Sequence, residues 1–541
     1  MVRTMCLALA ASLIVTGGLR GQDIDSPAPV VDTVVIVTGN VFTPEQSANN
    51  FFFRAMNAIH IVTKQQVIWK ELLFRPGEAY DSVKLAESER LLRAREIFRR
   101  VHIDSMRIGD RLAVIVDTQD GWSTKPNLKL TVATDGTWTG QFGLSEINLL
   151  GSGNLAHAAY VKDTDRRGLQ LAGDFRRLLG SPLEAAGSVN LWNDGPDGFW
   201  RFGDAWVSNL DSKSILYDGE AADRRILQYR IEDAATPDTT FYQHEFFTNR
   251  LTGAFASRAD AERYLRLGAK AEVRQEKYYL QRDSLLEIPD TVYGELGLFG
   301  EYSHSRFKQI SYFNGFGDED IDISTRLRLT LNLAASGLGY RRTGIGPQVE
   351  VSTGTQTAST FLVSSLKASG LLTEAGLDSG RVVLDLTFGL KPLPRHSTAL
   401  YVSAGAQENP PPGQEFDLGF QAPPRSWEPH SFVGTRMIWG TVEHRWYALE
   451  ALLDLISIGF AAFFDYGGAW YDGQDARFGG NIGIGLRMGG ALSTAARTGR
   501  IDFGCRIGEN SDLGDRCVAT LGAGFVFPWN PRAADLVQRT Y

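Results

Sequence analysis

The residues able to carry chemistry in this 541-residue sequence form no recognisable catalytic or metal-binding pattern. Eight histidines are present, but none belongs to a His-Glu-x-x-His motif, and no Cys-x-x-Cys pair occurs. No Gly-x-Ser-x-Gly turn is present for a nucleophilic serine. Gly483-Ile484-Gly485 is similar to part of a nucleotide-binding loop, but no helix is expected after it. We therefore predict no enzymatic activity, no metal and no cofactor.

A single acid, Asp465, interrupts an otherwise apolar stretch in the segment Phe416–Trp470. Apolar side chains occupy alternate positions around it, at Ile458, Phe460, Ala462, Phe464 and Tyr466. Period-two alternation with one apolar face is expected of a strand that faces hydrocarbon. A charge on that face would cost about 2–4 kcal/mol at the bilayer centre. Asp465 is therefore predicted to point into the lumen of a barrel, and the same alternation predicts that Glu443 and Arg445 point inward.

A buried carboxylate at position 465 requires a hydrogen-bond donor, because an unpaired one is costly. Arg445 on the neighbouring strand, Arg425 in the preceding loop and water in the lumen are the three candidates. Of these we favour Arg445.

Two cysteines remain after a predicted leader is removed, Cys505 and Cys517. They lie at equal distances from Ser511, at the centre of a turn-rich segment, so a hairpin would place them opposite each other. Secretion would permit a cross-strand disulfide. The alternative is two small apolar side chains on a lipid-facing surface.

The composition favours a β-protein over a helical membrane protein. The chain is 43% hydrophobic and holds 57 glycines, and outside the leader it has no apolar run of about 20 residues, the length a membrane helix needs. Transmembrane barrels have no such run, since lipid-facing and lumen-facing residues alternate. The net charge of −8 gives no indication of nucleic-acid binding.

The N-terminal region divides into a leader and a small domain. Residues 1–21 carry Arg3, an apolar core and then small residues, which is typical of a secretory signal. Residues 33–119 then show a β-branched strand, two amphipathic helices and two strands turned at Gly109-Asp110, in the order β-α-α-β-β.

This domain resembles a POTRA domain, the periplasmic module of the BamA/TamA-type outer-membrane assembly factor superfamily. The resemblance lies in Gly39, Glu71–Asp81, Ser88–Arg93 and Phe98–Val101. The stretch Phe142–Asn154 resembles the first barrel hairpin of the same family. The family combines POTRA domains with a bacterial surface antigen barrel, and this chain shows a single POTRA copy.

Residues 127–528 are accordingly predicted to form a transmembrane antiparallel β-barrel, with a tail at 529–541. The resemblance implies about sixteen strands, which the length accommodates at roughly 10 residues per strand. The polar stretch Asn209–Arg250 is predicted to be an extracellular loop. The last strand is predicted to run to Phe527, with Phe525 and Phe527 facing lipid.

The resemblance also implies a loop that folds back into the lumen. Its tip carries Arg-Gly-Phe/Tyr in the family, and the arginine pairs with an acid on a neighbouring strand. Here the matching residues are Leu418-Gly419-Phe420, without the arginine, and Asp465 matches the acid. Glu443 and Arg445 match a charged pair on the strand after the loop.

The implied function is insertion or translocation of outer-membrane or secreted polypeptides, through a lateral seam between the first and last strands and β-augmentation at the POTRA domain. The expected partners are unfolded client polypeptides, outer-membrane lipids and lipopolysaccharide, and periplasmic chaperones or accessory lipoproteins, but no nucleic acid. The expected location is the outer membrane, with the POTRA domain in the periplasm. The alternatives are a porin-like or surface barrel without an assembly role, and a secreted soluble β-protein.

Overall fold

The computed structural model describes residues 29–48, 50–178, 181–206, 209–230, 238–260, 262–280, 291–340, 343–411, 413–420, 423–452, 456–490, 498–508 and 516–527. The predicted secretory signal (1–21) and tail (529–541) lie outside these residues, as does the turn around Ser511. Over the described residues, no helix combines the length and the apolar character needed to cross a membrane.

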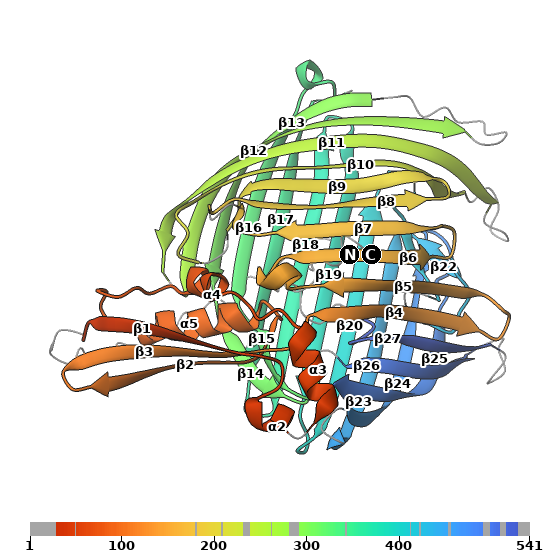
Figure 1. Cartoon of the computed structure of the whole chain (residues 1–541). Helices are drawn as coiled ribbons and strands as arrows, with labels where there is room; N and C mark the ends of the chain where they lie inside the picture. The colour runs from red at the N-terminus through yellow and green to blue at the C-terminus, as the bar shows by residue number, and fades with distance from the viewer. Residues whose placement is uncertain are drawn as a thin grey trace.

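The N-terminal domain is a three-stranded sheet covered by helices, and it lies at one end of a large barrel (Figure 1). The sheet has the order β1-β3-β2, with β1 parallel and β2 antiparallel to β3. Its strands are β1 (Val31–Gly39), β2 (Phe98–Ile108) and β3 (Arg111–Asp120). The helices α4 (Gln65–Glu71) and α5 (Ser82–Arg93) contribute Ile68, Leu85 and Leu92 to the buried core.

The domain contains two helices that the predicted β-α-α-β-β order lacks, α2 (Pro44–Ala48) and α3 (Phe51–Ile59). Asn50 caps α3, because its side chain accepts hydrogen bonds from the backbone N–H groups of Phe52 and Phe53. Both helices are too short to show several turns of helical periodicity, which explains why the sequence pattern did not reveal them.

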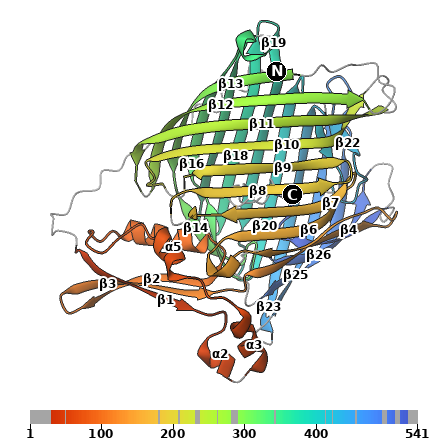
Figure 2. The same ribbon diagram turned by 45° about the horizontal axis from the view of Figure 1, so that its top comes forward.

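Twenty strands close the barrel, so the expectation of about sixteen was wrong. Every neighbouring pair is antiparallel, and β27 pairs with β4 to complete the ring (Figures 1 and 2). The first ten strands are β4 (Thr124–Ala133), β5 (Trp138–Glu146), β6 (Leu155–Lys162), β7 (Arg167–Phe175), β8 (Glu184–Trp192), β9 (Gly195–Asp204), β10 (Lys213–Arg230), β11 (Asp238–Ala259), β12 (Arg263–Leu280) and β13 (Thr291–His304). The others are β16 (Thr325–Ala334), β17 (Gly344–Gln356), β18 (Thr360–Thr373), β19 (Gly376–Leu390), β20 (His396–Glu408), β23 (Arg436–Leu452), β24 (Ile456–Trp470), β25 (Gly479–Gly490), β26 (Gly499–Ile507) and β27 (Cys517–Ala523).

The stretch predicted as an extracellular loop, Asn209–Arg250, instead supplies most of the long strands β10 and β11. These strands have 18 and 22 residues, whereas a membrane-spanning strand needs about 9–11. Part of each strand lacks the apolar alternation that identifies a strand in sequence.

The outer surface of the barrel is apolar where the strands alternate, as predicted. In β24 the exposed side chains include Phe460, Phe464 and Tyr466, while Asp465 between them is fully buried. Asp465 therefore points inward, and so do Glu443 and Arg445, which are also buried. This arrangement confirms the predicted orientation of all three side chains.

Two short hairpins fold into the barrel from opposite ends. The pair β14 (Phe307–Ser311) and β15 (Asp318–Asp322) follows β13, on the side of the N-terminal domain. The pair β21 (Phe416–Leu418) and β22 (Phe432–Gly434) follows β20, at the other end. A short helical turn, η1 (Leu149–Gly151), joins β5 to β6 at the rim near the N-terminal domain, and a second, η3 (Ser336–Leu338), follows β16.

The last barrel strand ends at Ala523, before the predicted boundary at residue 528. The chain then turns into the lumen, where Phe525 and Phe527 join a buried cluster with Phe313 and Tyr401. The prediction that both phenylalanines face lipid was therefore wrong. Alternation alone could not reveal this turn, because aromatic residues suit both surroundings.

Candidate functional site: the lumen loop and the seam it covers

The loop between β20 and β23 enters the lumen through its apolar residues. Phe416, Leu418 and Phe432 are buried against the wall residues Tyr401 and Trp439. The hairpin of β21 and β22 holds these side chains on one side. The loop is therefore part of the packed interior.

Gly419 is required at the turn that follows β21. Its φ of +122° lies in a region that favours glycine, and a Cβ there would lie 2.3 Å from the backbone oxygen of Glu428. Phe420, directly after it, is 2% exposed. Leu418-Gly419-Phe420 thus places one apolar side chain on each side of an obligatory glycine.

Arg425 reaches from this loop to the acid on β24. Its Nε lies 2.7 Å from Oδ2 of Asp465 and its Nη2 lies 2.9 Å from Oδ1, a bidentate pair. The guanidinium also lies 3.8 Å from the ring centre of Phe463. Asn481 on β25 donates to Oδ2 of Asp465 at 3.0 Å. Arg425 is thus the partner of Asp465, and the preference for Arg445 was wrong.

The charge network continues from Arg425 along the wall. Arg425 Nη1 lies 3.0 Å from Asp502 Oδ2, and Arg487 Nη1 lies 2.6 Å from Asp502 Oδ1. Arg487 Nη2 in turn lies 2.7 Å from Oε1 of Glu443, which also accepts a bond from Arg445 Nε at 2.6 Å. The predicted lumen charges Asp465, Glu443 and Arg445 thus belong to one continuous series of ion pairs along strands β23–β26.

The network holds four guanidinium groups and three carboxylates, so one positive charge is in excess. The fourth guanidinium belongs to Arg500, whose Nη1 lies 2.8 Å from Asp502 Oδ2. Although burial disfavours the charge on Arg425, the carboxylates of Asp465 and Asp502 raise its pKa above the ordinary value. The loop is therefore held by a permanent charge.

Arg445 connects the network to the hairpin from the opposite end. Its Nη1 donates to the backbone oxygen of Asn314 at 2.9 Å, and its Nη2 donates to that of Gly524 at 3.2 Å. The guanidinium lies 3.8 Å from the ring centre of Phe525. Arg445 therefore ties the β14–β15 segment and the chain after β27 to the same wall.

Glu319 organises the turn of the β14–β15 hairpin. Its Oε1 accepts backbone N–H bonds from Phe313, Asn314 and Gly315, at 3.3, 2.6 and 2.9 Å. Burial nevertheless raises the pKa of Glu319 to about 7. The turn thus depends on one carboxylate in the protein interior.

The seam between β27 and β4 has only four paired positions, from Val518 opposite Ala133 to Leu521 opposite Leu130. The register between β10 and β11 spans 18 positions. Strand β4 begins at Thr124, so its first half extends past the residues that pair with β27. The seam is the shortest strand pairing of the closed ring.

Residues of the loop cover this seam from inside. Phe420 packs against Ala133 and Val518, one residue from each seam strand. Arg516, just before β27, lies 2.6 Å from Asp135 and donates to the backbone oxygen of Ser426 at 2.9 Å. The loop therefore contacts both edges of the seam at the end farther from the N-terminal domain.

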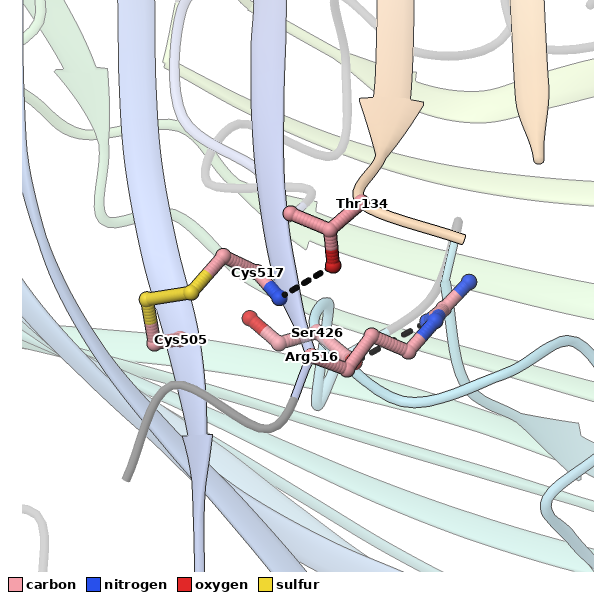
Figure 3. The surroundings of a disulfide bond; sticks show 5 residues. All are labelled: Thr134, Ser426, Cys505, Arg516 and Cys517. Carbon is pink, nitrogen blue, oxygen red and sulfur yellow. Dashed lines mark hydrogen bonds between the residues drawn. A yellow bond between two sulfur atoms is a disulfide. The ribbon is translucent and has the colours of Figure 1, made fainter. Parts of the chain in front are cut away.

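A disulfide joins Cys505 and Cys517 at the start of β27 (Figure 3). The two residues are directly opposite in the β26–β27 register, with Cα atoms 4.1 Å apart. The backbone N–H of Cys517 donates to Oγ1 of Thr134, across the seam, at 3.2 Å. The disulfide therefore attaches one seam strand to its neighbour next to the contacts of Arg516.

His430 attaches the loop to the hairpin turn between β6 and β7. Its Nδ1 lies 2.5 Å from Asp417 and its Nε2 lies 3.4 Å from Asp165. Hydrogen bonds to these two carboxylates raise the pKa of His430 to about 10. The imidazole is therefore charged at neutral pH.

The N-terminal domain is joined to the barrel rim by buried polar contacts. Oγ1 of Thr63 donates to Asp120 at 2.9 Å and accepts from Nδ2 of Asn148 at 2.9 Å. Nε of Arg93 lies 3.0 Å from Asp320 on β15. Movement of this domain would therefore act on the lumen hairpin.

Sequence reasoning missed several residues of the site. Arg487, Asp502 and Asn481 occupy lumen-facing positions of predicted strands, so a charged or polar side chain at an inward position was the available signal. Arg516 lies outside any strand and gave no periodic signal. No group of three or more His, Cys, Asp or Glu in the described part of the chain is placed to hold a metal ion.

No protein-family model and no curated protein matches this sequence. The fold is similar to a BamA from Haemophilus ducreyi lacking POTRA domains 1–3, at 10% identity and a TM-score of 0.39, over 92% of this chain and 84% of that one. It is similar to CdiB from Acinetobacter baumannii, at 10% identity and a TM-score of 0.47, over 92% and 74% of the two chains. It is also similar to the copper transporter OprC, at 9% identity and a TM-score of 0.37, over 77% and 83%.

Proposed function

We propose that this protein inserts or translocates polypeptides at the outer membrane, through the seam between β4 and β27. The observation that carries the proposal is the seam itself. Among the described residues, four register pairs and the backbone bond from Thr134 to Cys517 close it, and contacts from a lumen loop cover it.

The part of β4 that extends beyond the register with β27 is the proposed template for a client. From Thr124 to Lys129 this strand extends beyond the register with β27, along the half nearer the N-terminal domain. A strand edge is costly in lipid unless its backbone groups are paired. An extended client segment could add alongside this stretch through main-chain hydrogen bonds, where β27 does not reach.

The N-terminal domain is proposed to act as a POTRA domain in the periplasm and to deliver the client. Its strand β2 lies at the edge of the sheet and exposes Met106 and Ile108. An extended polypeptide can add to such an edge by β-augmentation. Unfolded outer-membrane or secreted polypeptides, with chaperones or accessory lipoproteins, are the proposed partners, alongside membrane lipid and lipopolysaccharide.

A porin-like or surface role is the alternative. A cavity of about 550 Å³ lies in the lumen and is lined mainly by β4–β10. The loop of β21–β22 and the hairpin of β14–β15 occupy the interior beside it, so conduction would require them to move. Such a role would not require the seam to open.

The test is a disulfide across the seam. Leu130→Cys and Leu521→Cys place thiols at directly opposed positions, with Cβ atoms at about 4.5–5.5 Å in such a pair. The locked variant is expected to lose the ability to maintain outer-membrane protein or lipoprotein levels in cells depleted of the native protein, and reductant should restore it.

The matched control is Leu169→Cys with Leu191→Cys, an opposed pair on β7 and β8 whose side chains are both exposed on the outer surface. This staple should leave the levels unchanged. Undiminished levels with the seam fully locked would refute the lateral route, and unchanged levels after depletion itself would refute the assembly role.

A further inference from the structure

We propose that helix α3 is an interfacial anchor that inserts into the periplasmic leaflet of the membrane surrounding the barrel. This inference requires that the barrel spans a membrane with the N-terminal domain on its periplasmic side, and it does not depend on the assembly role. The ligand is the acyl and glycerol region of phospholipid.

Helix α3 exposes large apolar side chains to an unusual extent. Phe51 is 77% exposed, Phe52 55% and Ile59 72%. Ala55, between them on the helix surface, is also exposed. An exposed, contiguous apolar surface marks a site of interaction with a partner or a membrane.

The helix is rigidly attached on its other side. Phe53 stacks on Phe42 with ring centres 3.9 Å apart, and both belong to a buried cluster that packs against Trp122, two residues before β4. Asn57 bonds to both backbone groups of Phe42, at 3.1 and 2.9 Å. The exposed surface thus belongs to a fixed helix, with Asn50 as its N-cap.

The apolar surface continues onto the barrel rim, which is why lipid is the occupant we favour. Ile61 is 51% exposed and approaches the rim turn, since a Cβ at Gly151 would lie 3.2 Å from its Cγ2. The backbone N–H of Lys64 donates to the oxygen of Gly151 at 2.9 Å. From this turn, strand β5 leads to the exposed Leu144 of the barrel's outer surface.

Leu150 in the same rim turn supports this assignment. It holds a φ of 54°, a conformation that is uncommon for a residue other than glycine, and its side chain is 64% exposed. Such a conformation persists only where the surroundings impose it. An apolar side chain held outward at this level is expected if it contacts lipid.

The charge and position of α3 agree with a membrane interface. Its sequence contains one cation, Arg54, and no acid, which favours contact with anionic headgroups. Figures 1 and 2 both place α2 and α3 beside the end of β23, at the barrel side of the N-terminal domain. An interfacial helix lies parallel to the membrane with its apolar face about 5–10 Å into the headgroup and acyl boundary.

The test uses the full-length protein in lipid nanodiscs, under oxidising conditions that preserve the native disulfide. A fluorescent label is attached to Phe52→Cys or Ile59→Cys, and the matched control carries it at Met106→Cys, an exposed position on β2 of the same domain. Nitroxide phospholipids, labelled at shallow or deep acyl positions, serve as quenchers.

We expect the labels at positions 52 and 59 to lose most of their fluorescence, more with the shallow than with the deep nitroxide, while the control keeps its own. A label at Ala55→Cys should lose this quenching when Phe52→Asp and Ile59→Asp are combined. Quenching no stronger than at position 106 would overturn the proposal. So would labels that resist both nitroxide lipid and aqueous iodide, because a protein partner would then cover the helix.

Discussion

The two sides of the lumen, along the late strands β23–β27 and the early strands β10–β12, are constructed differently. The early strands have 18–22 residues and long registers, and some of their lumen charges remain partly open, such as Arg250, which is 32% exposed. The late side ends in strands of 9 and 7 residues, but its lumen charges are buried and joined to the loop.

This difference indicates where each side obtains its stability. The early side is closed by backbone hydrogen bonds along long strands, so its closure does not depend on particular side-chain contacts. The late side has few such bonds near the seam, and it depends on buried ion pairs and apolar packing from the loop. A protein that must open at one place gains from having side-chain contacts, rather than a long strand register, hold that place closed.

The largest effect is expected from breaking the Arg425–Asp465 pair. Arg425→Ala and Asp465→Ala should each lower the free energy of barrel unfolding by about 3–5 kcal/mol, because each breaks a bidentate pair and leaves the charge of its other member buried. The double variant should lose little more than either single one, because the two side chains form one interaction. Urea-unfolding midpoints in lipid vesicles measure all three values.

The matched control is Arg250→Ala on β11. Its guanidinium also meets a carboxylate, with Nε 2.8 Å from Glu272, but it is partly exposed and should cost at most about 1 kcal/mol. Arg445→Ala combined with Asp465→Ala should be closer to additive, because Arg445 pairs with Glu443. Equal losses from Arg250→Ala and Arg425→Ala would remove the distinction between the two sides.

A smaller and more local effect is expected at the seam. Phe420→Ala removes a buried ring that contacts Ala133 and Val518, and should lower the free energy of local opening there by about 3 kcal/mol. Hydrogen exchange should then accelerate in β4 and β27 but not between β10 and β11.

Phe299→Ala on β13 is the control, because this phenylalanine is also buried in the lumen but lies next to the early strand β12, away from the seam. It should weaken the barrel without accelerating exchange at the seam. If both variants accelerate exchange equally throughout the ring, Phe420 has no special connection with the seam.

Sequence alternation was sufficient for the orientation of side chains and insufficient for tertiary pairing. The directions of Asp465, Glu443 and Arg445 follow from a period of two, which one strand shows by itself. The partner of Asp465 depends on how a loop of more than twenty residues crosses the lumen, and no local pattern encodes that path. Arg445, adjacent by strand order, was the more plausible candidate only because the loop was unplaced.

The strand number and the extra helices were missed for a related reason. Polar residues interrupt the alternation along β10 and β11, so these strands have too few apolar positions to be identified by it. Helices α2 and α3 are short, and Phe51, Phe52 and Ile59 of α3 are exposed rather than buried. Sequence periodicity identifies helices whose apolar face is buried against a protein core, so it does not detect such a helix.

The smallest predicted effect concerns His430, which joins the loop of the late side to Asp165 beside the early strands. Its pKa is raised to about 10 by hydrogen bonds to Asp165 and Asp417, while an unfolded chain releases the proton near pH 6.5. The folded protein therefore holds the proton more tightly. The stabilisation is complete below about pH 6.5 and is lost as pH rises through about 10.

The expected size is about 1 kcal/mol or less, because the imidazole is partly exposed and the ion pairs are screened. Urea midpoints of the native protein and of His430→Gln should differ at pH 6.5 and converge toward pH 10. Glutamine is the matched replacement because it can donate a hydrogen bond but carries no charge. A constant difference across this range would show that His430 contributes packing alone. The two sides of the lumen would then be connected through this residue without any dependence on charge.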